Sequence, residues 1–372
     1  MTNGAIHAVE IQARQLLRAS RVLEGKTQHE ALRLLPMIYH VCARAHAFAA
    51  QQAFACALGT TVPAPLMHQL LVLAETCREH ARRIFMDWPA LYGQTMDTEA
   101  VLEIQRRLQP IEQSVRTLMT VAESPGQNAL LQHVQALHAF VLPLLGEING
   151  ELEVGQLLQK VCNARGQRNC VPQVLQAMQE QAMADIGNSD VPSLCIHEVD
   201  SLYLAEQLGH DVEGKYIAAP HLHQQVYETG PLARMRDAPL LHTLLSQYGN
   251  GLMARFCAMV LELATIPQAM LNLLQEQDML CQQSRSLALA AETGMGGVEA
   301  ARGFLWHRVE MAQGRIKRYH ILAPTEWNFH PQGALFRGLL GLRVQAKTQL
   351  HKLAAMITTA LDPCVAYEIQ VI

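Results

Sequence analysis

The stretch that carries Cys42 and His46 constrains this fold most strongly. After Cys42 the chain is rich in alanine and has no glycine before Gly59, so it predicts a long helix over about 41–58. The two residues are four positions apart, which places both side chains on one face of a helix. A buried Cys beside a His is usually part of a core. The pair becomes a candidate site only if other residues point to the same place.

Much of the remaining chain also favours helices. Half of the 372 residues are hydrophobic and only 5% are aromatic, a mix that favours helix over sheet. Helical periodicity is expected over about 29–41, 66–87 and 238–282, and throughout 97–186 apart from breaks at Pro and Gly. Residues 332–361 are expected to form a final helix.

A small β element is predicted beside these helices. Residues 6–19 alternate polar and apolar as a strand does, and 186–231 are expected to form loops and short strands. The runs 304–310 and 315–322, with a turn at Gly314 between them, predict a β-hairpin. We therefore expect a mainly α fold with a small hairpin or sheet. No long linker or repeat divides the 372 residues, so a single domain is expected.

Two further local expectations concern side chains that later matter for the site. The glycine-rich stretch 294–297 is expected to be a loop. The polar side of the helix at 66–87 is expected to face solvent; it carries Glu75, Arg78, Glu79, Arg82 and Arg83.

Charge, cysteine usage and hydropathy exclude several classes of function. The formal net charge of −4 gives no basic footprint for nucleic acid. Nine cysteines form an odd number without the dense spacing of a disulfide framework. No signal peptide is evident, and no uncharged apolar run reaches the roughly 18–20 residues that span a bilayer. We expect a cytoplasmic protein with reduced thiols and no membrane partner.

Four more motifs carry groups that could bind or react. A second thiol, Cys364, follows Asp-Pro near the C-terminus, and two thiolates suit iron, zinc or copper(I) while leaving positions open on the metal. Taken singly, the other three motifs have ordinary structural explanations as ion pairs, turns or loops. They are Glu299-Ala-Ala-Arg302-Gly, Pro324-Thr325-Glu-Trp-Asn and Gly230-Pro-Leu-Ala-Arg234.

Taken in order, these motifs resemble the large subunit of [NiFe] hydrogenases. The match begins at Arg21-Val-Leu-Glu24-Gly and ends at the Asp-Pro-Cys that contains Cys364. The ordered set covers nearly the full length, so the resemblance implies a [NiFe] hydrogenase large-subunit-like fold.

The departures from the family pattern concern the nickel ligands. The N-terminal family motif is Arg-x-Cys-Gly-x-Cys-x-x-x-His, and here Tyr39 replaces the first Cys while Cys42 and His46 remain. In the C-terminal motif, Asp-Pro-Cys-x-x-Cys-x-x-His, Cys364 remains and Tyr367 replaces the second Cys. A phenol, with a pKa of about 10, is a poor nickel ligand at neutral pH. The resemblance therefore implies no nickel and no H₂ activation.

The end of the C-terminal motif also differs. Gln370 stands where the family has the His at which a maturation protease cuts, and the chain ends two residues later. We expect no tail to be removed.

The surroundings of the family's iron are better preserved. Arg302 and Thr325 occupy positions that, in the family, surround iron and hydrogen-bond its cyanides, although Ala301 replaces a Pro. Charge-assisted donors suit anionic diatomic ligands. Glu24 stands at the family's proton-transfer position, although a carboxylate there also suits a helix start.

This combination is similar to the HupK/HoxV-type hydrogenase-maturation proteins. The resemblance implies a non-enzymatic scaffold that transiently holds the Fe(CN)₂CO group and passes it to the true large subunit. It implies Cys42 and Cys364 as metal ligands, with His46, Arg302, Thr325 and Glu24 around them. It also implies two partners, a HypC-type maturation chaperone and the hydrogenase large subunit or its precursor.

The two thiols do not match equivalent family positions. Cys42 matches a bridging Cys and Cys364 a nickel-terminal one, so iron held by both requires a shifted geometry or a partner's thiolate. Two other functions stay open at this point. One is a metal-free mimic of the large subunit that acts as an assembly chaperone. The other is a residual redox enzyme with a different metal set.

Overall fold

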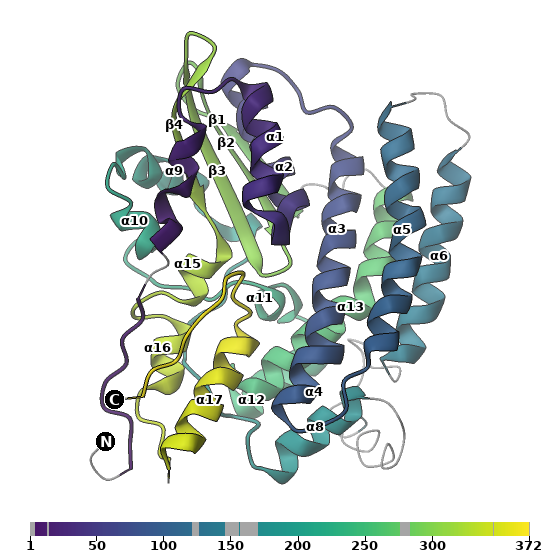
Figure 1. The fold of residues 1–372 in the computed structure, drawn as a ribbon, viewed down its shortest axis with the longest axis vertical. Helices are drawn as coiled ribbons and strands as arrows, with labels where there is room; N and C mark the ends of the chain where they lie inside the picture. Colours follow the sequence, from purple (N-terminus) through teal and green to yellow (C-terminus); the bar gives the residue numbers. More distant parts are fainter. Residues whose placement is uncertain are drawn as a thin grey trace.

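A four-stranded sheet beside a bundle of long helices dominates the structure (Figure 1). The computed structural model describes residues 4–12, 15–120, 126–145, 156, 170–275, 283–344 and 346–371. The sheet is antiparallel with its strands in chain order. They are β1 (Ser284–Ala288), β2 (Thr293–Ala300), β3 (Gly303–Ala312) and β4 (Arg315–Leu322).

One face of the sheet packs against α1 (Gln28–Ile38) and α2 (Ala43–Leu58). The capping box at Thr27 starts α1, and Gly59 ends α2 in the left-handed conformation. Both helices fall where the sequence predicts them. The opposite face of the sheet is covered by α9 (Ser201–His210) and α10 (Lys215–Ala218), which share a core with Trp306.

The glycine-rich stretch 294–297 is a strand, so the expectation of a loop there was wrong. Gly294 and Gly296 point at α2, where a Cβ on Gly296 would lie 2.4 Å from the carbonyl oxygen of Ala49. At Gly294 the same atom would lie 2.2 Å from the carbonyl oxygen of Ala53. Glycine is therefore needed here for the close approach of a strand to a helix, not for a turn.

The helical bundle surrounds α13 (Leu252–Gln275), most of which is buried. This helix is long and apolar enough to cross a membrane, but 67% of its most apolar window is buried, as expected of a core helix. The other bundle helices are α3 (Pro65–Arg82), α4 (Trp88–Leu91), α5 (Thr98–Thr120), α6 (Gly126–Leu144), α8 (Cys170–Glu180), α11 (Pro231–Met235), α12 (Pro239–Tyr248) and α17 (Lys347–Ala360).

Short elements connect the sheet to the bundle. The 3₁₀ helices are η1 (Gln15–Leu23), η2 (His40–Cys42) and η4 (Ile196–Glu198), and η3 (Arg83–Asp87) is a π-helical turn that continues α3. The small helices α15 (Pro324–Asn328) and α16 (Ala334–Leu339) follow β4. The two ends of the chain lie close together at the lower left of Figure 1.

The predicted hairpin is confirmed as β3 and β4, whereas three other expectations were wrong. Residues 6–12 form no strand, with Ile6, Val9 and Ile11 packed in or against the bundle core, and η1 occupies 15–23. The segment 186–231 contains helices and isolated bridges in place of short strands. The final helix is two helices, since the chain turns at Gly341, where φ is +84°. The parts of the helical predictions that fall on 121–125, 146–155, 157–169, 276–282 and 345 lie outside the described residues, as do residues 13 and 14 of the predicted strand.

The contact between β2 and α2 gives a first prediction. Gly296→Ala should lower the free energy of unfolding by about 1–3 kcal/mol, because the added methyl group overpacks the interface. Urea denaturation measures this. Ser286→Ala is the control, because Ser286 pairs with Gly296 across the sheet but is exposed; its effect should stay within about 0.5 kcal/mol. Equal effects of the two changes would contradict the proposed role of Gly296.

Candidate functional site

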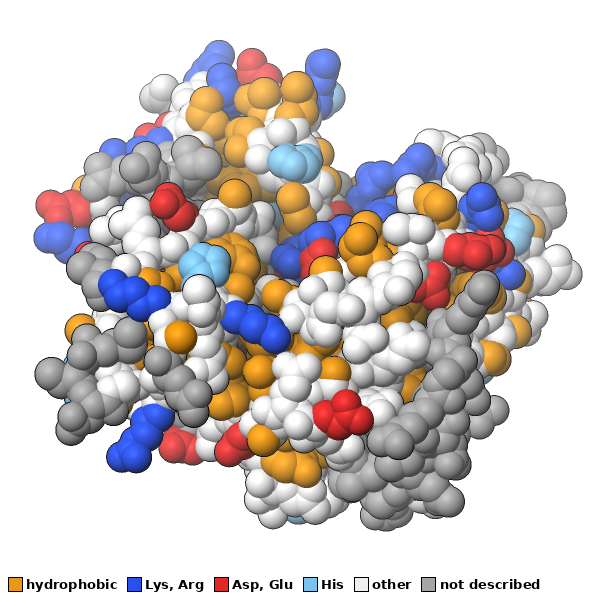
Figure 2. Space-filling view, turned by 60° about the horizontal axis from the view of Figure 1, so that its bottom comes forward, with side chains coloured by type: hydrophobic (Ala, Val, Ile, Leu, Met, Phe, Trp, Pro, Cys, Tyr) orange, Lys and Arg blue, Asp and Glu red, His pale blue; other side chains and the backbone are white. Residues whose placement is uncertain are grey.

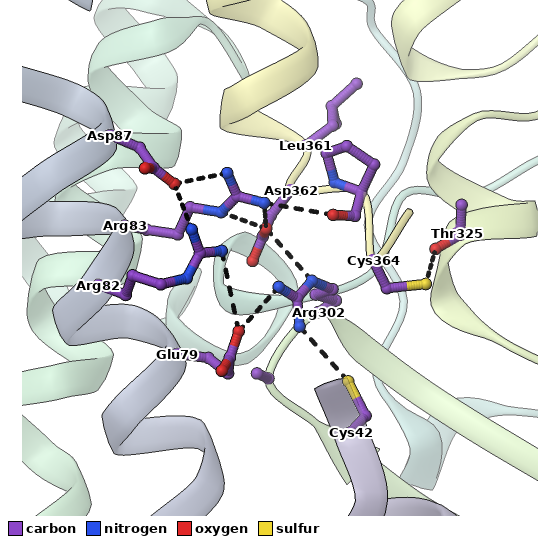
Figure 3. A network of polar contacts seen from close by, with 12 residues as sticks. Cys42, Glu79, Arg82, Arg83, Asp87, Arg302, Thr325, Leu361, Asp362 and Cys364 are labelled. Atoms are coloured by element: carbon purple, nitrogen blue, oxygen red, sulfur yellow. Dashed lines mark hydrogen bonds and ion pairs between the residues drawn. The ribbon is translucent and has the colours of Figure 1, made fainter. Parts of the chain in front are cut away.

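Cys42 lies at the junction of η2 and α2 and faces the turn between β2 and β3. This turn carries Arg302, whose Nη1 donates to Cys42 Sγ at 3.4 Å (Figure 3). Both side chains are buried. A sulfur and a guanidinium that are 260 residues apart in the chain thus meet in the interior.

The other nitrogen atoms of Arg302 face two carboxylates. Nη2 donates to Glu79 Oε2 at 3.0 Å. Nε lies 3.2 Å from Asp362 Oδ1, which is an ion-pair distance, although the Nε–H is not directed well enough for a hydrogen bond. Burial disfavours the charge of Arg302, but the carboxylates of Asp362 and Glu79, with Asp362 the larger influence, outweigh that penalty and raise its pKa. The guanidinium therefore remains charged beside Cys42.

Cys364 approaches the same region from the C-terminal segment. Its Sγ lies 2.9 Å from the hydroxyl oxygen of Thr325 on α15. Asn328, one turn further on, donates to the carbonyl oxygens of Arg302 (3.3 Å) and Leu361 (3.4 Å). The same short helix thus positions the Arg302 turn and the segment that precedes Cys364.

Burial controls the protonation of Cys42. It raises the pKa of the Cys42 thiol far above the ordinary range, and the nearby Arg302 only partly offsets this effect. The thiol is therefore neutral at physiological pH, and binding a metal there requires loss of its proton. Within the described residues, no three His, Cys, Asp or Glu side chains are grouped so as to hold a metal ion. Of the described cysteines, Cys42 and Cys364 are the two placed near Arg302, so a metal bound by both would still need ligands of its own or from a partner.

His46 faces the sheet, next to Tyr39. Its Nδ1 lies 2.9 Å from His307 Nε2, and His307 Nδ1 lies 2.7 Å from the hydroxyl oxygen of Tyr319. Burial lowers the pKa of His307 to about 3, so its ring is neutral. The Tyr39 ring stacks on the His46 ring with 4.2 Å between centroids. The phenol that replaces the first family Cys thus packs as an aromatic neighbour of His46.

The structure leaves Glu24 and Tyr367 exposed. Glu24 is exposed after η1 and lines a separate surface hollow together with Asp211 and Lys317. Tyr367 is 47% exposed. Of the predicted residues, Cys42, Cys364, Arg302 and Thr325 are therefore brought to one region. His46 borders it, and Glu24 does not join it.

Glu75 and Glu79 on the polar side of α3 face the interior, so the expectation that they face solvent was wrong, whereas Arg78 and Arg82 are 33% and 40% exposed. Glu75 is buried and accepts hydrogen bonds from the backbone N–H groups of Arg44 (2.9 Å) and Ala45 (3.1 Å). It thereby caps the first turn of α2, directly after Cys42. Glu79, one turn along α3, holds Arg302. Arg78, Arg82 and Arg83 lie three or four positions from these two carboxylates, a pattern that suits local ion pairs on an exposed face equally well, so no sequence signal marked this role.

A second buried network of ion pairs holds the residues that precede Arg302 in the β2–β3 turn. Arg234 on α11 pairs with Glu299 (2.6 Å) and Glu262 (2.5 Å) and donates to the carbonyl oxygen of Ala301 (3.0 Å). Burial by itself would raise the pKa of Glu262, but Arg234 and His80 lower it to about 2. This network accounts for the motifs around Arg234 and Glu299. Both residues support the site from a distance.

In Figure 2 the upper outline of the molecule is notched between two raised parts. Lys and Arg side chains gather at the bottom of this notch, with Asp and Glu side chains among them. Hydrophobic side chains are also visible on this face, several of them next to one another left of the centre of the view.

Comparisons with known proteins agree with these motifs. Residues 178–369 match the family model described as nickel-dependent hydrogenase. The hydrogenase expression/formation protein HoxV of Cupriavidus necator is 30% identical over 95% of this chain and 90% of its own length. The corresponding protein HupK of Azotobacter vinelandii is 27% identical over 100% of this chain and 96% of its own length.

The fold is similar to that of solved hydrogenases. The Ni-Fe-Se hydrogenase of D. vulgaris Hildenborough matches 98% of this chain and 94% of its own chain, with a TM-score of 0.66 and 17% identity. At that identity the likeness shows the fold alone. The predicted large-subunit-like fold is thereby confirmed.

The buried cap on α2 gives a prediction about pH. Burial raises the pKa of Glu75 from its ordinary value to about 7, despite the two backbone donors. Because the unfolded state ionises first, Glu75 should make the protein less stable as pH rises from about 4.5 to 7, by at most about 3 kcal/mol. Glu75→Gln keeps one acceptor oxygen and removes the titration. The unfolding free energy of the wild type, relative to that of the variant, should therefore be lower at pH 8 than at pH 5. Urea denaturation at the two pH values measures this difference. A pH-independent difference would contradict the raised pKa.

Proposed function

The chain belongs to the nickel-dependent hydrogenase family, among the HupK and HoxV hydrogenase expression/formation proteins, and on that premise we propose that it is a scaffold for iron in hydrogenase maturation. Membership supports a role in hydrogenase formation, and we propose that the role is that of an accessory protein. The finer proposal is that it transiently holds the Fe(CN)₂CO group and passes it to the true large subunit. The group is cargo, and the chain performs no catalysis on it.

The convergence of two sulfur-bearing segments on Arg302 carries this proposal. Cys42 meets Nη1 of Arg302, and Asp362, two residues before Cys364, meets Nε. Cyanide ligands are anionic acceptors, and a buried guanidinium is a strong, fixed donor. The Thr325 hydroxyl beside Cys364 can supply a second donor. These residues suit a small metal group that carries anionic ligands.

The ligand set suits iron that brings its own ligands better than nickel. The described residues hold no cluster of three potential protein ligands. Iron that already carries two cyanides and one CO needs fewer protein ligands than a bare ion. Tyr39 stacks on His46 and Tyr367 is exposed, so neither phenol supports a nickel site. We therefore propose no nickel and no H₂ activation for this chain.

Partners follow from the same reasoning. Two sulfurs leave positions open on the metal, and a thiolate from a HypC-type chaperone would complete the set during loading. Delivery requires a second partner, the hydrogenase large subunit or its precursor. Neither partner is a nucleic acid, and we propose that the exchange takes place in the cytoplasm.

A metal-free role is the alternative. In this structure Arg302 already has Cys42, Glu79 and Asp362 as partners, so the cluster is electrostatically satisfied without any cargo. A large-subunit-like shape by itself could bind maturation factors or hydrogenase subunits. In that case complex formation would not need either thiol.

Infrared spectroscopy tests the scaffold. Protein purified anaerobically together with its maturation partners should contain iron and show CO and cyanide bands. Cys42→Ala and Cys364→Ala should each remove these bands, because each removes one of two sulfur ligands. Cys56→Ala is the matched control: Cys56 lies on the same helix as the Cys42 junction, is only partly buried, and should leave the bands unchanged.

The result also separates the two proposals. Bands that persist in both single variants would overturn the scaffold. Two results together would support the metal-free role. The wild type would contain no iron and show no infrared bands, and a Cys42→Ala/Cys364→Ala double variant would still co-purify with its partners at wild-type yield.

A further inference from the structure

The segment that carries Cys364 is held by few contacts beyond its first residues. Asp362 and Pro363 are buried, Cys364 is partly exposed, and the residues from Ala366 to Glu368 are exposed. Asp362 also adopts a left-handed backbone conformation, with φ at +50°. Residues other than glycine seldom adopt this conformation, and it persists where surrounding contacts enforce it. The contacts of Asp362 and Pro363 therefore decide where Cys364 points.

Arg83 makes most of these contacts. Its Nε donates to Asp362 Oδ1 at 2.5 Å, and its Nη2 donates to the carbonyl oxygen of Pro363 at 3.2 Å. Its third nitrogen, Nη1, donates to Asp87 Oδ2 at 2.7 Å, which fixes the side chain on η3 (Figure 3). The Arg83 side chain is 12% exposed. One guanidinium thus joins the bundle to both residues that precede Cys364.

The π-helical turn explains why two adjacent arginines share this region. Neighbouring residues on a regular α-helix point about 100° apart. Arg82 ends α3 and Arg83 begins η3, yet both donate to Asp87 Oδ2, at 3.0 and 2.7 Å. A single π-helical turn within a helix is frequently found at a functional site. Of the two arginines, Arg83 contacts the segment that carries Cys364. Arg82 is 40% exposed, and its second carboxylate neighbour is Glu79 at 3.9 Å.

Asp362 connects this contact to the proposed iron site. The same carboxylate oxygen that accepts from Arg83 lies 3.2 Å from Nε of Arg302. Without Arg83, Asp362 would keep Arg302 as its partner, and the Pro363 carbonyl would lose a charged donor. The turn could then move as a unit with Arg302, and Cys364 would lose its fixed distance from Thr325.

We infer that Arg83 is a positioning residue that fixes the Asp362-Pro363-Cys364 turn and so holds the Cys364 sulfur toward the Arg302 region. Its relevance to iron binding rests on the proposed function. Its role in fixing the turn does not. Arg83 touches no cargo; it acts through Asp362 and the Pro363 carbonyl.

Three variants at neighbouring positions test this inference. Arg83→Gln removes the guanidinium with its several N–H donors. Arg83→Lys retains the positive charge but not the planar arrangement of donors. Arg82→Gln is the matched control, because it removes the same charge one residue away. Peptide-level mass spectrometry measures the alkylation rate of Cys364 and hydrogen exchange over 362–371. Arg83→Gln should raise the alkylation rate about tenfold, as expected when charge-assisted contacts to buried acceptors are lost. Arg83→Lys should give an intermediate rate, and Arg82→Gln should stay near wild type.

The spectroscopic readout distinguishes positioning from general stability. In protein loaded with its maturation partners, Arg83→Gln should shift or weaken the cyanide and CO bands, while Arg82→Gln should leave them in place. Equal alkylation rates in wild type and Arg83→Gln would overturn the inference, as would equal increases in Arg83→Gln and Arg82→Gln. Failure of the proposed function would give a different result. The infrared bands would be absent from the wild type, or would persist in variants that lack Cys42 and Cys364, and the alkylation rates would not affect that conclusion.

Discussion

The burial of the Arg302 guanidinium is the constraint on which the rest of the site depends. A buried charge is tolerated only when nearby groups compensate it. Glu79 from α3 and Asp362 from the C-terminal segment provide that compensation, and the neutral thiol of Cys42 accepts a hydrogen bond from the same guanidinium. Each comes from a different part of the chain, so the requirement to pair one cation draws three segments together. The position of both thiols follows from this requirement.

The same principle extends outward from Arg302. Three arginines at positions 302, 83 and 82 alternate with three carboxylates at 79, 87 and 362 in a connected network (Figure 3). Because their formal charges balance, the network needs no external ion. Behind the turn, Arg234 binds Glu262 and Glu299 in a second network, and Arg255 pairs with Glu228 at 2.8 Å. Buried arginines therefore fix the irregular segments to the helical bundle, where hydrophobic packing by itself would leave their orientation free.

Several parts of this arrangement could be predicted from the sequence. The Ala-rich helix after Cys42 and the hairpin β3–β4 follow from local propensity and periodicity, which depend on neighbouring residues only. The ordered motifs indicated the family and its fold. The glycines of β2 were misjudged because glycine also marks turns, and only the packing of α2 at Ala49 and Ala53 explains them. Glu75 and Glu79 were assigned to solvent for a related reason: helical periodicity gives the direction of a side chain but not what lies opposite it.

The sequence by itself determined the inventory of this site: two thiols in place of four, two tyrosines at the altered positions, and an arginine and a threonine in the family's iron-side motifs. Tertiary structure decided which of these groups meet. It placed Cys42 against Arg302, stacked Tyr39 on His46, left Tyr367 and Glu24 exposed, and brought in Glu79 and Arg83. The physical reason is that local patterns set helices and turns, whereas the pairing of buried charges depends on residues that are hundreds of positions apart.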